Sequence, residues 1–308
     1  MEIKRVLRAA KRFLIDPSYR RLWYLDIFPQ KNMDAKHYLE LRYEAIFNKK
    51  LNLENPATFN EKMQWLKLYD QNPLHTQMVD KYLSKKIVAN RIGEQYVTKL
   101  LGVWNNVDEI DVSQLPEKFV LKTTHDCGGV VICKDKESFS LKKAKKFLRK
   151  HMKREYFYHC REWPYKNVKP RIIAEEFLQD GDSSVLPVYK ILCFDGNPRI
   201  IQTIQNDKKP NETIDYFDPQ WNLLDFRQNY PNSSKPLPKP EKLEEMLSLA
   251  RTLAEGKSFI RVDLYSANGK IYFSEFTFFS DAGFAAFNPE HWDLTLGDWI
   301  TLPSLVQK

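Results

Sequence analysis

The chain has 308 residues, of which 43% are hydrophobic and 29% are charged, and its net charge is +8. This length and composition are typical of a folded protein with one large domain or two to three smaller ones. No apolar run approaches about 18 residues, and basic residues between positions 4 and 12 interrupt any signal peptide, so we expect neither a membrane span nor secretion. The cysteines form no Cys-x-x-Cys pair, which argues against zinc and disulfides and predicts a cytoplasmic protein; they are Cys127, Cys133, Cys160 and Cys193.

The positive charge predicts an anionic partner, which could be a nucleotide, an acidic sugar, a membrane surface or a nucleic acid. The basic residues are spread along the chain and show no helix-turn-helix, RNP or zinc-finger pattern. We therefore expect no nucleic-acid partner.

Residues 3–14 place their apolar side chains on one helical face and five basic side chains elsewhere. Such a helix can lie on an anionic membrane surface, or it can dock on its own domain. Asp16-Pro17 ends it, and the aromatic and basic run Tyr19–Tyr24 could extend either role. Peripheral membrane contact through residues 1–24 is therefore one of two open alternatives.

Helical spacing continues over residues 37–47, and Thr58 with Glu61 forms a capping box that opens another helix. Asn72-Pro73 breaks the chain, and the pattern predicts one helix from about Leu74 until Gly93 stops it. The segment Asp80–Lys86 within that helix is, by itself, typical of a solvated helix face.

After Gly93 the pattern becomes strand-like. Two strands, 119–124 and 130–133, flank the loop His125-Asp-Cys-Gly-Gly129, whose backbone N–H groups could cover phosphates within reach of Lys122. A lone Gly-Gly is also typical of an ordinary turn. A basic helix follows from Ser140 to about Lys153.

Residues 154–170 form a loop dense in aromatic and charged residues, as binding loops often are, although a packed structural loop is equally consistent. A strand over 171–178 ends in acidic residues. Residues 188–194 and 199–204 predict a hairpin with Lys190 in the middle of an apolar strand, where a lysine needs an anion or an exposed face. Residues 206–240 predict a long polar excursion and 241–254 a helix.

Residues 259–279 predict a second hairpin that carries Arg261, Asp263 and Glu275. A two-residue turn at Asn268-Gly269 would point the two carboxylates to opposite faces. We therefore expect a three-residue loop, which places Arg261 opposite Glu275 with Asp263 on the diagonal of the same face. That face would suit a magnesium–phosphate site, or it could hold a plain Arg–Glu ion pair in solvent.

Taken in order, these segments resemble the ATP-grasp superfamily and, within it, the TupA-like ATP-grasp family, over roughly residues 35–303. No single motif is specific to this family, but the number of motifs and their order along the chain are specific to it. The motifs are Phe59–Asp70, Asp80-Lys81, Leu101–Trp104, Phe119–Lys122, Gly128-Gly129, Arg161–Tyr165, Glu175-Glu176, Arg261–Asp263 and Gly297–Trp299.

The resemblance implies an α+β ATP-grasp fold in which two α+β subdomains grip ATP. Residues 1–95 would be a helical N-terminal region carrying the first phosphate lysine, 96–178 the lid subdomain, and 179–308 the C-terminal subdomain with the metal site. Lys81, Lys122 and Lys190 resemble the phosphate-binding lysines, with the hairpin that contains His125, Gly128 and Gly129 as a lid. The hinge strand Glu175, Glu176, Phe177 and Leu178 would hold adenine, with Asp180 or Asp182 at the ribose.

The resemblance further implies that Asp263 and Glu275 bind Mg²⁺ and that Arg261 clamps the transferring phosphoryl group, with Lys190 assisting. The superfamily usually has Asn two residues after the metal glutamate, whereas this chain has Thr277, a poorer ligand. One of the two Mg²⁺ ions would then bind weakly or through a water molecule. Acceptor contacts are expected from the loop residues and from the segment after the hairpin: Arg161, Trp163, Tyr165, Lys166, Asp281 and Gly283.

Superfamily members mostly activate a carboxylate as an acyl phosphate that an amine then attacks. Because the family is associated with bacterial surface polymers, the expected reaction couples an amino acid or other amine to a sugar acid of a capsule, O-antigen or teichuronopeptide-like polysaccharide. A glycosyltransferase and an ATP-grasp kinase of a sugar or polymer are the alternatives. No general base is evident, since His75 and His291 are better explained as structural.

Overall fold

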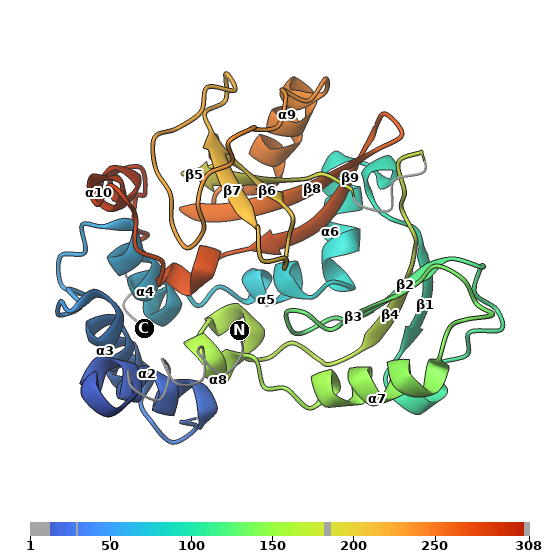
Figure 1. Cartoon of the computed structure of the whole chain (residues 1–308), viewed down its shortest axis with the longest axis horizontal. Helices are drawn as coiled ribbons and strands as arrows, with labels where there is room; N and C mark the ends of the chain where they lie inside the picture. The colour runs from blue at the N-terminus through green and yellow to red at the C-terminus, as the bar shows by residue number, and fades with distance from the viewer. Residues whose placement is uncertain (1–12, 29, 182–185, 305–308) are drawn as a thin grey trace.

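The computed structural model describes residues 13–28, 30–181 and 186–304. A helical N-terminal part is followed by two antiparallel sheets (Figure 1). This is the predicted α+β arrangement. The helix expected over residues 3–14 falls almost entirely outside the described residues. Within the described ranges no helix combines the length and hydropathy needed to cross a bilayer.

In the N-terminal part the helices predicted over 37–47 and after Thr58 are present and α2 is a helix that was not predicted, while one prediction is an exception. Asp16 caps α2 by accepting a hydrogen bond from the Tyr19 N–H at 3.0 Å, and Thr58 and Glu61 form the predicted capping box of α4. The five helices are α2 (Pro17–Ile27), α3 (Ala35–Phe47), α4 (Phe59–Tyr69), α5 (Pro73–Val79) and α6 (Leu83–Ile92).

The exception is the single helix predicted from Leu74 to Gly93, which is wrong. The carboxylate of Asp80 accepts hydrogen bonds from the N–H groups of Tyr82 at 2.9 Å and Leu83 at 3.4 Å, so it ends α5 and starts α6. Such local capping competes with helix continuation. As a result Lys81 lies in a tight turn between two helices and not on a solvated helix face.

The first sheet has the strand order β1-β4-β2-β3, and all its pairs are antiparallel. One face packs on α7 (Leu141–Met152), where Phe119, Leu121 and Ile172 join Leu148 in a buried apolar cluster. The residues that alternate with these along each strand point to the opposite face of the sheet, away from α7. The strands are β1 (Leu100–Trp104), β2 (Phe119–Thr123), β3 (Val130–Cys133) and β4 (Ile172–Glu176).

The second sheet has the order β7-β6-β5-β8-β9, again antiparallel. Helix α9 (Leu243–Ala254) covers one face, where Cys193 lies 3.9 Å from the Ala250 carbonyl oxygen. Successive side chains of a strand point to opposite faces, and Lys190 is three residues before Cys193, so Lys190 lies on the other face. The strands are β5 (Val188–Phe194), β6 (Asn197–Gln205), β7 (Thr213–Phe217), β8 (Phe259–Ala267) and β9 (Lys270–Thr277).

Strand β7 was missed, because it lies inside the polar stretch 206–240, where Ile214, Tyr216 and Phe217 are too few to form a clear alternating pattern. It is formed by pairing with β6, a long-range contact. The remaining short elements are η1 (Glu94–Tyr96), η2 (Val107–Glu109), α8 (Phe157–Cys160), η3 (Trp163–Tyr165), η4 (Ser280–Gly283) and α10 (His291–Asp298).

The arrangement in Figure 1 brings the uncovered faces of both sheets toward the middle of the molecule. The loop that joins β2 to β3 extends into this middle region, and α5 runs beneath the second sheet. The tip of the β8–β9 hairpin contacts the chain after β4, because the Asn268 N–H donates to Asp180 Oδ1 at 2.9 Å and the Asn268 side chain donates to the Gln179 carbonyl at 2.8 Å.

Candidate active site

The β8–β9 hairpin differs from its predicted register in two ways that compensate each other. Its turn has two residues, Asn268 and Gly269, both with positive φ, so Ala267 pairs with Lys270 and the predicted three-residue loop is wrong. A β-bulge further along then shifts the register by one residue, so that Asp263 faces Glu275 directly.

Because of the bulge, the two carboxylates share a face despite the short turn. Arg261 faces Thr277 and not Glu275 as predicted. Its guanidinium forms a bidentate pair with Asp263, with Nε–Oδ1 at 2.7 Å and Nη2–Oδ2 at 2.9 Å, and lies 4.0 Å from Glu275. Arg261 and Asp263 are 8% and 2% exposed, so this is not an ion pair on a solvated face.

A polar row crosses the second sheet through this pair. The register aligns Gln202 of β6, Lys190 of β5, Asp263 of β8 and Glu275 of β9 on neighbouring strands. Neighbouring strands lie about 4.8 Å apart, so a single small anion can contact several of these side chains. The row lies on the face that α9 leaves uncovered.

Four cations from separate elements surround Glu275. Lys81 Nζ lies 3.8 Å from Glu275 Oε2. Burial alone raises the pKa of Glu275, but the charges of Lys81, Arg261, Lys190 and Lys122 reverse this effect, and its pKa is lowered. Residues separated by up to about 200 positions in the sequence therefore form one strongly positive site around a carboxylate pair.

Lys122 of β2 is held by Glu175 of β4, the next strand in the first sheet. Lys122 Nζ and Lys85 Nζ each lie 2.6 Å from an oxygen of the Glu175 carboxylate. Burial opposes ionisation of Glu175, but the two lysines outweigh it and lower its pKa to about 2. The carboxylate predicted to hold adenine is thus engaged with two lysines.

The segment after β4 provides the other predicted nucleotide contacts. Glu176 accepts a hydrogen bond from the Lys99 N–H at 2.7 Å, and Phe177 and Leu178 are partly buried in the irregular chain beyond the strand. Asp182 lies outside the described residues.

The glycine loop between β2 and β3 is tied to the same site. Lys81 Nζ donates to the Asp126 carbonyl at 2.8 Å. A Cβ added at Gly129 would lie 1.8 Å from Thr123 Oγ1, and Gly128 has a φ of +84°, so both positions favour glycine. His125 is buried, and burial lowers its pKa.

The loop residues predicted to contact the acceptor differ in how far the structure exposes them. Arg161 is 2% exposed, and its guanidinium donates to the carbonyls of Tyr158 at 2.7 Å and Gln30 at 2.5 Å, so it fastens the loop and does not face a ligand. Trp163 and Tyr165 are partly buried in η3, and Lys166 is exposed.

The chain after β9 carries unusual backbone conformations beside Arg261. Asp281, Ala282 and Gly283 have φ values of 46°, 53° and 62°, which strains the first two. Lys67 of α4 donates to the Ala282 carbonyl at 2.7 Å, and Gln64 donates to the Gly283 carbonyl at 2.6 Å. Asp281, predicted to contact the substrate, is exposed, whereas Gly283 is buried against α4.

A comparison with known protein families matches residues 61–301 to the family described as TupA-like ATPgrasp. The chain belongs to this family. The match covers most of the chain and includes every residue of the positive site described above. None of the curated proteins compared matches the chain.

Solved structures of similar arrangement include ligases. The D-alanine–D-alanine ligase from Bacillus anthracis complexed with ATP is 16% identical at a TM-score of 0.41, and the alignment covers 66% of this chain and 55% of that chain. The same ligase from Helicobacter pylori is 16% identical at 0.41, covering 80% and 70%. The D-cycloserine synthetase DcsG is 14% identical at 0.40, covering 74% and 70%.

The chain therefore spans a little over half the length of the Bacillus anthracis ligase. At these TM-scores the likenesses carry no argument about this protein. Its assignment to the ATP-grasp family rests on the sequence match.

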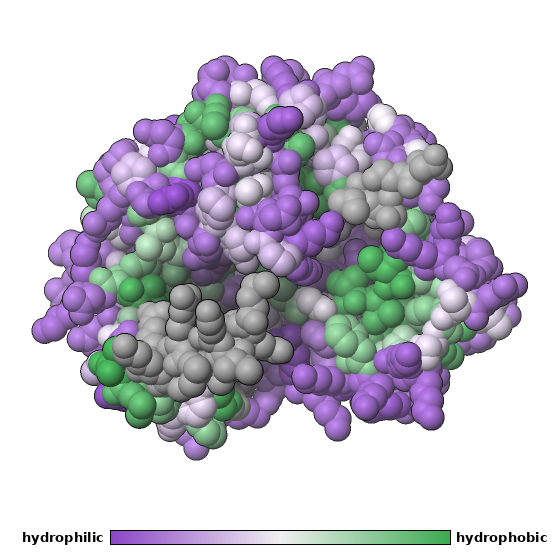
Figure 2. Space-filling model, viewed as in Figure 1, coloured by the Kyte–Doolittle hydropathy of each residue, from purple (hydrophilic) through white to green (hydrophobic). Residues whose placement is uncertain are grey.

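This ATP-grasp protein also has an apolar surface that the sequence motifs did not indicate. Figure 2 shows hydrophobic residues gathered over β2, β3 and β4. The exposed large hydrophobic residues of the first sheet are Leu100, Val103, Val130 and Ile132, which are 36%, 38%, 40% and 51% exposed. Register places Val130 beside Lys122, so the patch adjoins the positive site.

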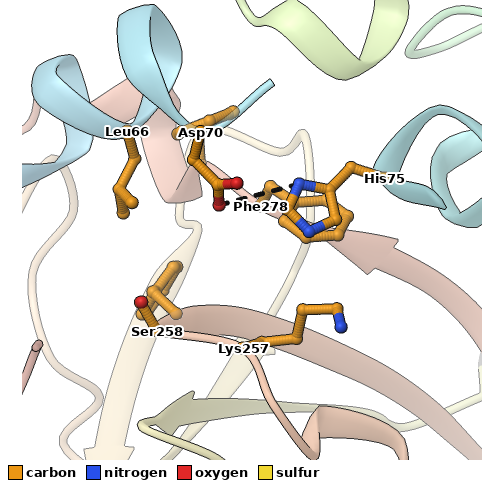
Figure 3. Close-up of a pocket in the computed structure, with 8 residues that line it drawn as sticks. Leu66, Asp70, His75, Lys257, Ser258 and Phe278 are labelled. Carbon is orange, nitrogen blue, oxygen red and sulfur yellow. Dashed lines mark ion pairs between the residues drawn. The ribbon is translucent and has the colours of Figure 1, made fainter. Parts of the chain in front are cut away.

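A small cavity lies where α4, α5 and the start of β8 meet, and none of the four cations described above lines it (Figure 3). Its volume of about 10 Å³ suits a single water molecule. The His75 ring lies against Phe278, and His75 Nδ1 is 3.8 Å from Asp70 Oδ2. Burial lowers the pKa of His75 to about 4, so it is neutral at physiological pH, consistent with the predicted structural role.

The carboxylates of the site suit magnesium only together with other ligands. No cluster of three or more histidine, cysteine or acidic side chains that could hold a metal occurs in the described ranges. Mg²⁺ usually takes one or two carboxylates and completes its shell with water and phosphate oxygens. Asp263 and Glu275 on adjacent strands fit this pattern, because each Asp263 oxygen that accepts from Arg261 keeps a further lone pair.

Proposed function

We propose that the protein is an ATP-dependent, magnesium-requiring ligase that joins a carboxylate to an amine through an acyl phosphate. The observation that carries this proposal is the convergence of Lys81, Lys122, Lys190 and Arg261 on Glu275. Four cations around two adjacent carboxylates suit a triphosphate whose charge they neutralise and the magnesium ion that accompanies it.

In this proposal the triphosphate lies between the sheets. Lys81, Lys122 and Lys190 contact its phosphates, and the glycine loop closes over them as a lid. Adenine rests on the apolar patch beside Lys122, against the chain that follows β4. Residues 96–178 and 179–308 act as the two subdomains that grip the nucleotide.

Asp263 and Glu275 would hold Mg²⁺, with Thr277 as a weaker or water-mediated ligand. The ion neutralises phosphate charge during transfer. Arg261, fixed by its bidentate pair with Asp263, is held in one orientation toward the same oxygens. It can stabilise the transferring phosphoryl group and then the oxyanion that forms when the amine adds.

The acid we propose is a sugar acid of a bacterial surface polysaccharide, and the amine an amino acid. The net charge of +8 supports an acidic substrate. A kinase would bind ATP at the same residues, so the product decides between the two reactions. A glycosyltransferase would use a nucleotide-sugar donor and would not need ATP.

The test is to incubate the purified protein with MgATP, glucuronate or galacturonate, and glycine, L-alanine or L-glutamate, and to identify products by mass spectrometry. ADP with an amide supports the ligase. ADP with a stable phosphorylated sugar identifies a kinase. No ADP with any pair refutes the proposal for this substrate class, and transfer from UDP-glucose favours the glycosyltransferase.

We also propose a cytoplasmic protein with peripheral membrane contact through its N-terminal residues. In α2, Trp23, Tyr24 and Ile27 are 41%, 49% and 51% exposed, close to Arg20 and Arg21. Aromatic and basic side chains of this kind suit an anionic interface. Cosedimentation with phosphatidylglycerol vesicles should fall in a Trp23→Ser, Tyr24→Ser variant, and absence of binding by the wild type ends the idea.

A further inference from the structure

The polar row across the second sheet contains a side chain that the reaction above does not use. Gln202 of β6 lies directly opposite Lys190 of β5. Gln202 is 4% exposed, and its amide oxygen Oε1 is buried with no hydrogen-bond partner among the described residues. Buried amide oxygens normally accept a hydrogen bond, because an unpaired one has lost the bonds that water would make with it. This oxygen therefore lacks a donor that a bound molecule can supply.

The side chains on either side of Gln202 leave its oxygen unpaired. Tyr216 of β7 lies directly opposite Gln202, but the Tyr216 hydroxyl donates its single proton to Gln228 Oε1 at 3.0 Å. The Tyr216 ring is held in place by stacking on Phe226, with the two ring centroids 4.3 Å apart. Lys190, on the other side, has its Cβ about 5 Å from the Gln202 Cβ, as directly opposed residues do, and still does not donate to Oε1. The amide oxygen of Gln202 is thus available to a ligand.

Gln202 projects from the active-site face of the sheet. Lys190 pairs with Gln202 on one side and with Asp263 on the other, and directly paired residues project from the same face. Two other oxygens of this sheet, Thr203 Oγ1 and Asp215 Oδ2, are also buried without a partner in the described ranges. Thr203 and Asp215 pair with each other, and because successive residues of a strand point to opposite faces, they lie on the face away from the site. Of these three residues only Gln202 therefore faces the proposed reaction.

We propose that Gln202 binds a hydroxyl group of the acid substrate and so makes the enzyme specific for hydroxylated acids. This inference rests on the proposed ligase function. In that reaction magnesium and phosphate occupy the end of the row at Asp263, and the acid lies toward the other end, past Lys190. Strands about 4.8 Å apart place Gln202 roughly 10 Å from Asp263, so an acid of monosaccharide size that receives the phosphoryl group beside Lys190 extends to Gln202.

A hydroxyl group suits this position better than the ammonium group of the other substrate. The positive charge of Lys190 repels a second cation placed next to it. A hydroxyl group is neutral, carries one donor and can donate it to Gln202 Oε1. Lys190 is only partly buried, so a ligand can approach this part of the row. The last torsion of a glutamine side chain is broad, which lets the amide turn its oxygen toward that ligand.

Removal of single hydroxyl groups from the acid tests this role. Glucuronate or galacturonate is compared with its monodeoxy derivatives, with MgATP and with glycine, L-alanine or L-glutamate as the amine, and kcat/KM for each acid is measured from ADP formation. In Gln202→Met, which keeps the side-chain length, kcat/KM for the parent acid should fall roughly 10- to 100-fold. For the derivative that lacks the bound hydroxyl, wild type and variant should agree within about threefold, and so should the KM for ATP, because neither includes this hydrogen bond. The matched control is Thr203→Val, which removes an equally unpaired oxygen from the opposite face of the same strand and should change none of these values.

One monodeoxy acid on which wild type and Gln202→Met act equally well supports the role. Equal loss with every acid, as expected if Gln202 binds the amine or only supports the fold, overturns it, and so does no loss with any acid. In both cases ADP and amide formation by the wild type sustain the proposed ligase. If the wild type forms no ADP with any pair, the ligase proposal fails and this inference with it. If Gln202→Met does not fold, Gln202→Leu takes its place, and a wild type that uses every monodeoxy acid as well as the parent overturns the role without any variant.

Discussion

Replacing Glu175 with glutamine should destabilise the first sheet, because it leaves Lys85 and Lys122 without the carboxylate that both contact at 2.6 Å. Removing one partner of a buried ion pair costs about 3–5 kcal/mol. The ionisation of Glu175 gives a separate figure. Its pKa falls from 4.5 to about 2, which at about 1.4 kcal/mol for each pKa unit amounts to about 3 kcal/mol.

The two figures agree on a loss of about 3 kcal/mol in the free energy of unfolding. At about 2 °C for each kcal/mol in a chain of this size, the melting temperature should fall by about 6 °C. The pH dependence adds a second signature. Because the folded-state pKa is the lower one, this stability is fully present above pH 4.5 and is lost as the pH falls toward about 2.

Urea denaturation at pH 7 and at pH 3.5 provides the assay. The matched control is Glu176→Gln, the next residue along β4, whose carboxylate accepts a hydrogen bond from the Lys99 N–H and whose replacement should cost less than about 1 kcal/mol. The difference between wild type and Glu175→Gln should shrink at the lower pH. A Glu175→Gln protein within about 0.5 kcal/mol of wild type at pH 7 would show that the ion-pair reasoning is wrong.

Three further predictions concern the site. Glu275→Gln should abolish ADP formation with little loss of stability, because the Glu275 side chain is 38% exposed. Asp263→Asn should lose both ADP formation and stability, since it removes the bidentate partner of buried Arg261. Unchanged turnover in both variants would falsify the metal assignment. MgATP at 100 times its dissociation constant should stabilise the fold by about 2.7 kcal/mol in a thermal shift assay, and UDP-glucose should not; the opposite pattern contradicts the ATP site. Gly129→Ala should lower both the melting temperature and MgATP affinity, because its Cβ would lie 1.8 Å from Thr123 Oγ1, and an unchanged protein would contradict this packing.

The local elements were readable from the sequence because their signals are local. The capping box at Thr58 and the alternating strands depend on residues a few positions apart. The single helix predicted across Asp80 was wrong because helical spacing continues through it, whereas the Asp80 carboxylate accepts hydrogen bonds from the Tyr82 and Leu83 N–H groups and interrupts the helix. Strand β7 depends on its pairing with β6, to which a polar sequence gives no clue.

The sequence by itself determined the family, most of the strands and the residues we propose for the phosphate and metal site. Tertiary structure alone decided which of those residues meet. A β-bulge set Asp263 opposite Glu275, whereas the two-residue turn alone would have pointed them to opposite faces. Lys81 and Glu275 lie in a turn and a strand far apart in the sequence, and their approach to 3.8 Å exists only after the chain has folded. Charge pairing, burial and hydrogen bonding depend on distances through space, and spacing along the chain constrains those distances only within one element.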